Sequence, residues 1–378
     1  MITILDTSAD WVKRFIKQRP ELSLVIATIV AIVLFVGASL YANVLIYDYI
    51  TGATGAATGL GTNQNVIDTL VRYDSNHYIA IARDGYATPV SAAFLPLYPL
   101  LIRFVHSLTQ LSYGWSALLV SWVALCAAVV VLYRWLKFEL GKIGSKVSPW
   151  LAIGLLAVFP TSLYFALAYT ESLFLLVNLG ALLAFRKERY WLAAVLAGLA
   201  AVTRYQGLVL PLFFVGDFLL RKSSGYQYKK LLPVLGTIVG FSCYMIFLQR
   251  HYGNPLEFIT AEQNWGRLHG NFISTIITTM RPDYLWFFVV LAVGLWGVWR
   301  HLGVVYAVYS AVFIFQPISS GSLDSINRYI VSLMPLFLVL AIIVAPKARQ
   351  WLKTSYIVSA TVLLAWSIAL FANGYWVA

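Results

Sequence analysis

The stretch from Arg72 to Tyr86 concentrates side chains that can do chemistry. Its fifteen residues hold two acids, two arginines, a histidine and three tyrosines, in a chain of which only 11% is charged. In a helix, Asp74, His77 and Tyr78 share one face with Ile81, because positions i, i+3, i+4 and i+7 lie on the same side. Such a face can form a reactive surface. The alternative at this point is an amphipathic helix at a membrane surface, whose charges merely face water.

The composition decides what surrounds this stretch. The 378 residues are 60% hydrophobic, with a mean hydropathy of +0.78, and they contain repeated apolar runs of membrane-spanning length. This predicts an all-α, polytopic membrane protein. The net charge of +12 comes from short basic clusters between apolar runs, which is typical of membrane insertion and not of nucleic-acid binding. Cys126 and Cys243 lie inside apolar runs, so no disulfide or zinc framework is inferred.

The apolar runs predict about 11 transmembrane helices in one domain, 1–378. The first run, from Leu22 to about Tyr47, is too long for a signal-peptide core and reads as an uncleaved span. Residues 48–112 then form a long first outer loop with juxtamembrane helices, in which Phe94 to Leu108 lies in, or re-enters from, the outer surface. The later predicted spans are roughly 113–133, 149–167, 171–185, 190–203, 207–220, 231–249, 284–299, 302–316, 329–345 and 354–373.

The basic residues predict the orientation, since cytoplasmic loops collect Lys and Arg. With the N-terminus cytoplasmic, all eleven lysines fall inside, including Lys142, Lys187 and Lys230. The polar span ends that hold acids, arginines, tyrosines and histidines then all fall outside. We therefore expect an integral, multi-pass protein with its active site on the extracytoplasmic face.

Four outer residues each allow a functional and a plainer interpretation. Glu171 lies between two apolar runs, where a carboxylate is either paired and functional or a snorkelling acid at a span end. Arg204 and Arg328 can anchor the interface, but no lysine is used there, and guanidinium is the better fork for phosphate or carboxylate. His251 precedes a turn signal, so a loop histidine is as consistent as a ligand-binding one.

Several nucleotide and hydrolase motifs are missing from the sequence. It has no Gly-x-x-x-x-Gly-Lys-Ser/Thr loop, no Gly-x-Gly-x-x-Gly after a strand, no Gly-x-Ser-x-Gly and no His-Glu-x-x-His. A nucleotide-driven pump, or a transferase that uses a nucleotide sugar in a soluble domain, is thus poorly supported.

The ordered polar motifs resemble those of the PIG-V-type mannosyltransferases of the GT-C superfamily. The family's first outer loop has an aromatic-Asp-x-x-His-aromatic motif, then Ile-Ala-x-x-Gly-Tyr and an aromatic, Pro-rich step. Tyr73 stands where the family often has Trp, and Arg328 lacks the preceding Pro. The matching stretches here are Tyr73 to Tyr78, Ile81 to Tyr86, Phe94 to Pro99, Thr170-Glu171-Ser172, Thr203 to Gly207, Tyr252 to Leu256 and Asn327-Arg328-Tyr329.

This resemblance implies an inverting glycosyltransferase that moves mannose from a polyprenyl- or dolichyl-phosphate donor to a membrane-associated glycan or glycolipid. Asp74 would be the catalytic base for the acceptor hydroxyl. Arg328, or as second choice Arg204, would hold the donor phosphate, and Glu171 or His77 would orient the acceptor or the base. No metal or cofactor is expected. The substrate-binding candidates are Arg72, His77, Tyr78, Glu171, Arg204, Gln206, His251, Asn254 and Arg328.

Two other functions remain open from the sequence. A transporter or flippase of a polyprenyl-linked lipid would also place arginines and aromatic residues near the interface, although no inverted repeat is visible. A lipid-phosphate-dependent transferase of another sugar fits the same residues. The expected partners are the lipid-linked sugar donor, the glycan or glycolipid acceptor and membrane lipids, with no nucleic acid.

Overall fold

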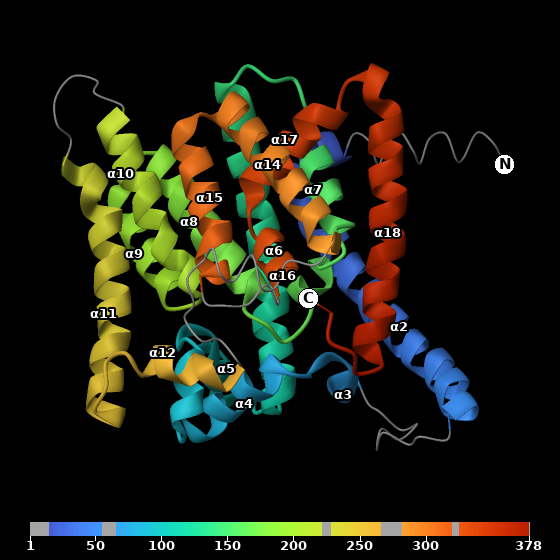
Figure 1. The fold of residues 1–378 in the computed structure, drawn as a ribbon, viewed down its shortest axis with the longest axis vertical. Helices are drawn as coiled ribbons and strands as arrows, with labels where there is room; N and C mark the ends of the chain where they lie inside the picture. The colour runs from blue at the N-terminus through green and yellow to red at the C-terminus, as the bar shows by residue number, and fades with distance from the viewer. Residues whose placement is uncertain (1–14, 55–65, 221–227, 266–281, 320–324, 378) are drawn as a thin grey trace.

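The computed structural model describes residues 15–54, 66–220, 228–265, 282–319 and 325–377. Within these ranges the chain folds into α-helices and short 3₁₀ turns, without a β-strand. The prediction of an all-α protein is therefore confirmed. Long helices run side by side along the vertical axis of Figure 1, and several short helices gather at the lower end.

The first half of the chain alternates long apolar helices with short polar ones. The first helix continues to Thr54, past the predicted end near Tyr47. The Oγ atoms of Ser112 and Ser148 accept hydrogen bonds from the backbone and cap the two helices that follow them. The elements are α2 (Pro20–Thr54), α3 (Val66–Leu70), α4 (Asp74–Asp84), η1 (Pro89–Ala93), α5 (Leu97–Thr109), α6 (Tyr113–Lys142), α7 (Pro149–Ala157), η2 (Ser162–Phe165) and α8 (Glu171–Arg186).

The second half continues the same pattern. Helix α11 (Leu232–Tyr252) ends at Gly253, which has φ +77°, a left-handed conformation that glycine adopts without strain. The elements are α9 (Tyr190–Ala201), η3 (Tyr205–Val209), α10 (Leu210–Leu220), η4 (Tyr228–Leu231), α11 (Leu232–Tyr252), α12 (Glu257–Glu262), η5 (Gln263–Trp265), α14 (Pro282–Leu302), α15 (Val304–Ile318), α16 (Ile326–Ile330), α17 (Met334–Val344), η6 (Lys347–Arg349) and α18 (Gln350–Ala372).

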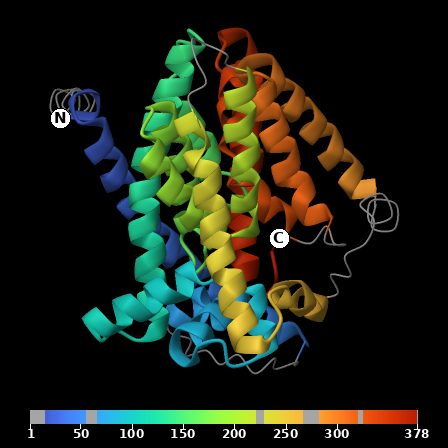
Figure 2. The ribbon, with the colours of Figure 1, turned by 90° about the vertical axis from the view of Figure 1, so that its left-hand side faces the viewer.

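The predicted outer loop holds the short elements. Its described part, 66–112, contains α3, α4, η1 and α5, while 55–65 lie outside the described residues. Helix α5 has 13 residues, about 20 Å at 1.5 Å per residue, which is short of a hydrocarbon core of about 30 Å. It packs against α4 and α6 at the lower end of the bundle. Figure 2, turned by 90°, shows the same gathering of short helices below the long ones.

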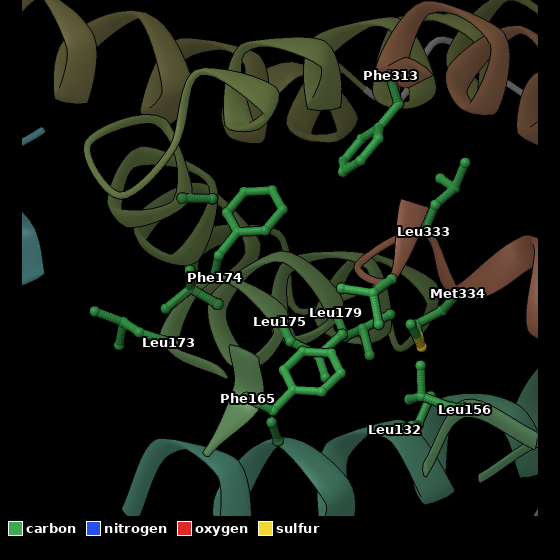
Figure 3. Packing of buried hydrophobic residues seen from close by; sticks show 14 of the residues in the cluster. Leu132, Leu156, Phe165, Leu173, Phe174, Leu175, Leu179, Phe313, Leu333 and Met334 are labelled. Atoms are coloured by element: carbon green, nitrogen blue, oxygen red, sulfur yellow. The ribbon is translucent and has the colours of Figure 1, made fainter. Parts of the chain in front are cut away.

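Helix α8 lies at the centre of the apolar core. Nearly all its side chains are buried, as expected of a helix that is hydrophobic on every side. The rings of Phe174 on α8 and Phe313 on α15 lie 6.0 Å apart, and Figure 3 shows them with other buried residues of the same cluster, among them Leu175 and Leu333. This packing fixes α8 between α6, α9 and α15, and so fixes the positions of its two ends.

Helices α9 and α11 cross closely through small residues. A Cβ atom on Gly198 would lie 2.7 Å from the carbonyl oxygen of Gly236, and one on Gly240 would lie 2.5 Å from the carbonyl oxygen of Gly198. Small residues spaced four apart are typical of helix contacts inside membranes. The contact holds the end of α11 next to the short helices.

The outward faces of several helices are apolar, as expected of an integral membrane protein. Exposed side chains include Val33 on α2, Val239 on α11 and Val362 on α18. In the described part of the chain, four helical segments are long and apolar enough to cross a membrane, and four shorter apolar helices accompany them. The count of about eleven spans stays a prediction.

Lysines and the outer motifs lie at opposite ends of the same helices. Lys142 and Lys187 are at or just beyond the C-terminal ends of α6 and α8, and Lys230 precedes α11. The other end of α8 begins with Glu171, and that of α11 carries His251. This separation is what the predicted topology requires, although the side of the membrane on which each end lies stays a prediction.

A buried ionic network lies at the end of α8 that is close to Lys187. Arg186 Nε donates to Glu139 Oε1 at 2.8 Å, and its Nη1 donates to Asp217 Oδ1 at 2.7 Å. The Tyr306 hydroxyl also donates to Glu139 Oε1, at 2.7 Å. All three ionic side chains are almost wholly buried, so removal of the arginine would leave two buried acids without this cation. This network joins α6, α8, α10 and α15.

Candidate active site

Asp74 and Arg328 meet across the fold. Asp74 begins α4, and Arg328 lies in the short helix α16. Arg328 Nη1 donates to Asp74 Oδ2 at 2.9 Å, while its Nε and Nη2 donate to Glu171 Oε1 at 3.0 and 2.9 Å. The planar guanidinium can bridge two carboxylates in this way, and an ammonium group lacks that fork. Arg328 therefore fixes Asp74 relative to the start of α8.

Glu171 holds a second arginine. Arg204 Nη1 lies 2.7 Å from Glu171 Oε1 and donates to Thr170 Oγ1 at 3.0 Å. Glu171 is fully buried, and a buried carboxylate is stable only when it is paired and hydrogen-bonded. Its place in the first turn of α8 adds the favourable field of the helix N-terminus. Glu171 is thus a paired acid between two arginines, not a snorkelling one.

The four groups form a charge-balanced row in the order Asp74, Arg328, Glu171 and Arg204. Aromatic rings flank its cations. The Cζ atom of Arg328 lies 4.6, 4.8 and 5.1 Å from the ring centroids of Tyr164, Tyr169 and Trp376, and that of Arg204 lies 5.3 Å from the Tyr329 ring. Such contacts favour the charged guanidinium and limit its movement.

Two non-glycine residues that closely precede Asp74 and Arg328 in the sequence have positive φ angles. Tyr73 has φ +55° and ψ −119°, and Ser325 has φ +68°. Non-glycine residues adopt positive φ rarely, at a cost of about 1–3 kcal/mol, and only where surrounding contacts hold them. For Tyr73 those contacts include a hydrogen bond from its hydroxyl to the Gly374 carbonyl and an edge contact with Trp376 at 5.0 Å.

A cavity of about 380 Å³ opens beside this row. The Asp74 side chain is 26% exposed, whereas Glu171 is 0% exposed, so Asp74 is the acid of this pair that a substrate can reach. Burial, followed by the nearby Asp74 carboxylate, raises the pKa of Tyr78, so its phenol stays protonated and can donate a hydrogen bond. The lining residues are Asp74, Tyr78, Ala93, Phe94, Leu95, Thr170, Thr203, Arg204, Tyr205, Gln206, Glu262, Ser325, Arg328, Tyr329 and Trp376.

Most of the predicted site residues meet here. Asp74, Tyr78, Arg204, Gln206 and Arg328 line the cavity, and Glu171 lies directly behind the two arginines that it pairs with.

Four predicted residues lie elsewhere. Arg72 Nη2 donates to the Ala372 carbonyl, and His77 stacks on Phe94 with ring centroids 4.6 Å apart. His251 Nε2 lies 2.7 Å from the Tyr86 carbonyl, and Asn254 Oδ1 accepts from the Leu256 amide in the turn before α12. Their roles in substrate binding stay predictions.

Ten of the lining residues are not among the predicted site residues, and four of these come from the last third of the chain. Glu262, Ser325, Tyr329 and Trp376 reach the cavity from α12, the turn before α16, α16 itself and the segment after α18. Tyr329 could have been found, because it directly follows Arg328 in a quoted motif. Trp376 carries no comparable signal in the sequence.

A larger apolar cavity of about 1040 Å³ lies next to the polar one. Its walls come mainly from α9 and α11, with Trp191, Leu235 and Val239 exposed on them. At its other end it reaches Pro96 and Val202, whose neighbours Leu95 and Thr203 line the polar cavity. A hydrogen bond from the Leu97 amide to the Val202 carbonyl ties these two segments together between the cavities.

No group of three or more His, Cys, Asp and Glu side chains that could hold a metal ion is found within the described ranges. Asp84, the second acid of the α4 stretch, pairs with Arg83 in solvent, and that hydrogen bond lowers the pKa of its carboxyl. Asp84 is therefore an exposed acid, as the sequence indicated.

Comparison with known proteins adds a family to this geometry. Residues 57–232 match the protein family described as Mannosyltransferase (PIG-V). The GPI alpha-1,6-mannosyltransferase 2 of Cricetulus griseus is 29% identical over 152 residues, which cover 39% of this chain and 31% of the relative. The GPI mannosyltransferase 2 of Drosophila pseudoobscura pseudoobscura is 28% identical over 209 residues, which cover 49% of this chain and 45% of the relative.

The chain thus spans between about a third and a half of the length of these curated relatives. The region matched by the family carries Asp74, Glu171 and Arg204, three of the four members of the charged row, and Arg328 lies beyond it. Over the matched region the chain is therefore similar to the PIG-V-type mannosyltransferases, and this similarity supports a mannosyltransferase.

Proposed function

We propose that this chain transfers a mannosyl residue from a polyprenyl- or dolichyl-phosphate donor to a membrane-associated glycan or glycolipid, with inversion at the anomeric carbon. The reaction takes place on the extracytoplasmic face. The observation that carries this proposal is an accessible carboxylate, Asp74, held by an arginine at the wall of a cavity that also presents a second arginine, Arg204.

Asp74 acts as the general base. An acceptor hydroxyl must lose its proton as it attacks the anomeric carbon, and a positioned carboxylate can take that proton. Direct displacement needs one such base on the acceptor side and gives inversion, so a β-linked lipid sugar yields an α-mannoside. Arg328 fixes the direction of the Asp74 carboxylate by the 2.9 Å hydrogen bond.

The geometry favours Arg204 over Arg328 for the donor phosphate. The Nε, Nη1 and Nη2 atoms of Arg328 all donate to Asp74 or Glu171, and three aromatic rings surround its guanidinium. Arg204 is held through Nη1 and lines the cavity. A guanidinium so placed stabilises the charge that grows on a departing phosphate. We therefore propose Arg204 as the first choice for the residue that holds the donor phosphate, whereas the sequence had suggested Arg328.

The apolar cavity between α9 and α11 supports a lipid-linked donor. It opens on exposed apolar faces and ends where Pro96 and Val202 adjoin residues of the polar cavity. An isoprenoid chain in this groove would leave its phosphate beside the polar cavity. We propose the donor's polyprenyl chain as the occupant, because the groove is lined mainly by apolar side chains and reaches residues that adjoin the polar cavity.

The relatives' names support a glycolipid acceptor, since they are those of GPI mannosyltransferases. No cofactor or metal enters the proposed reaction. The donor brings its own leaving group, and the two arginines and Asp74 supply charge stabilisation and the base.

Reconstitution of the purified full chain in lipid nanodiscs tests this function. Labelled polyprenyl-phosphate mannose and GDP-mannose are offered separately, with a panel of glycolipid acceptors, and the product anomer is determined by NMR. We expect transfer from the lipid phosphate alone, with an α-linked product. Transfer from GDP-mannose, or a retained β-configuration, would contradict the proposal. Movement of the lipid across proteoliposomes without transfer would favour the flippase instead.

A further inference from the structure

Residues 371–377 contribute Trp376 to the lining of the polar cavity. Neither the ordered motifs nor the matched region 57–232 includes this segment. The segment is held on several sides. The Ala372 carbonyl accepts from Asn43 Nδ2 at 2.8 Å and from Arg72 Nη2 at 3.1 Å, and the Val377 carbonyl accepts from the Tyr164 hydroxyl at 2.7 Å. These contacts join α2, the turn before α4 and η2. The segment is therefore a built part of the site.

Trp376 is the aromatic residue of this segment that lines the cavity. Four other aromatic side chains line it, namely Tyr78, Phe94, Tyr205 and Tyr329, and all are less exposed than Trp376, whose relative exposure is 39%. One part of the Trp376 indole is taken up by Tyr73 at 5.0 Å and by the Arg328 guanidinium at 5.1 Å. The Tyr164 ring lies 6.2 Å away, and the indole keeps enough exposed surface to line the cavity.

We propose that the Trp376 indole is the platform on which the transferred sugar ring lies. This inference rests on the proposed function. In a direct displacement, the sugar lies between the departing phosphate oxygen and the base that serves the acceptor. Along the charged row these positions belong to Arg204 and Asp74, with Glu171 and Arg328 between them. The Trp376 ring lies 5.1 Å from the Arg328 guanidinium. A hexose presents an apolar face of C–H groups that an indole can cover, while its hydroxyls bond to polar neighbours.

The chemistry separates this role from a purely structural one. A sugar platform contributes to binding of the glycosylated lipid phosphate but not to binding of the same lipid phosphate without its sugar. A residue that merely holds Arg328 would affect both lipids alike, because both carry the phosphate. The ratio of the two affinities therefore reports on contact with the sugar.

The test compares the affinities of purified wild type, Trp376→Leu and Trp376→Phe for polyprenyl-phosphate mannose and for polyprenyl phosphate. Trp366→Leu is the matched control, since that indole is exposed on α18 and lines neither cavity. Leucine keeps apolar volume against Tyr73 but removes the flat face. We expect Trp376→Leu to weaken binding of the glycosylated lipid about fivefold to tenfold relative to the sugar-free lipid, with Trp376→Phe and Trp366→Leu near wild type.

The other possible results of these binding and transfer measurements separate the platform from the proposed function. An unchanged ratio in Trp376→Leu would overturn the platform and leave the proposed function intact. Equal weakening for both lipids would also overturn it and assign Trp376 to positioning Arg328. Specific binding of the glycosylated lipid by wild type without any mannosyl transfer would overturn the proposed reaction but not the platform. A wild type that binds neither lipid would overturn both.

Discussion

Asp74 and Arg328 stand 254 residues apart in the sequence, yet the carboxylate of one accepts a 2.9 Å hydrogen bond from the guanidinium of the other. The same guanidinium also holds Glu171, which in turn holds Arg204. The base and the proposed phosphate ligand are therefore two ends of one rigid row. A change in the middle of the row is expected to reach both ends.

Replacement of Arg328 tests the middle of the row. Lysine keeps the charge but cannot bridge two carboxylates, so Arg328→Lys should lower turnover by about tenfold to a hundredfold, the value of one or two charged hydrogen bonds. Arg328→Ala should lower it further. Turnover is measured at saturating donor and acceptor, with Arg83→Lys, at an exposed arginine, as the control. If Arg328 were only an interfacial anchor, lysine would substitute freely.

The sequence indicated the members of the charged row more clearly than the other residues that line the cavity. Glu171, Arg204 and Arg328 are ionic residues next to apolar runs, where burial must be offset by partners, so position alone marks them. The same signal marked Glu139, Asp217 and Arg186, which were overlooked because they lie in the lysine-rich half. Which partner each residue takes could not be predicted, because such pairs depend on how distant helices pack.

Helical spacing predicted only part of the surroundings of the Asp74 face. It placed Asp74, His77 and Tyr78 on one face, and Asp74 and Tyr78 do line the cavity together. His77 instead stacks on Phe94, which comes from the loop after η1 and covers it. A pattern within one helix cannot show which neighbouring segment will lie over part of its face. Trp376 escaped notice for the same reason, since its position depends on the course of the whole of α18.

The groove between α9 and α11 predicts a dependence on lipid length. Val239→Trp should fill it and raise the KM for a long polyprenyl-phosphate mannose, while leaving the KM for a short-chain analogue close to wild type. Ile238→Trp is the matched control. Ile238 directly precedes Val239 on α11 and is also apolar and exposed, but it does not line the groove. Equal effects of the two variants, or equal effects on both donors, would remove the polyprenyl chain from this groove.

The network around Arg186 predicts a loss of stability without a role in chemistry. Arg186→Met leaves Glu139 and Asp217 buried without their cation, which should lower the free energy of unfolding by about 3–5 kcal/mol. Arg134→Met breaks an exposed pair with Glu21 and should cost at most about 1 kcal/mol. Thermal unfolding in detergent compares them. Similar midpoints for the two variants would contradict a stabilising role for the buried network.

The predicted orientation is open to a labelling experiment. In a background without Cys126 and Cys243, single cysteines replace Asp84, at the site end, and Lys142, at the other end; both positions are exposed. A membrane-impermeant maleimide added outside intact cells or sealed right-side-out vesicles should label position 84 and spare position 142. Labelling of position 142 from outside would reverse the topology and place the site on the cytoplasmic face.

The turnover of Asp74→Asn tests the central claim most directly. Asparagine keeps the size of the side chain and can still contact Arg328, but it cannot take the acceptor's proton. At saturating donor and acceptor, the rate of mannosyl transfer should fall by about 10² to 10⁴, with thermal stability and donor affinity close to wild type. Glu188→Gln, at an exposed acid just after α8 that lines neither cavity, should retain the wild-type rate. A near-normal rate for Asp74→Asn would show that Asp74 is not the base.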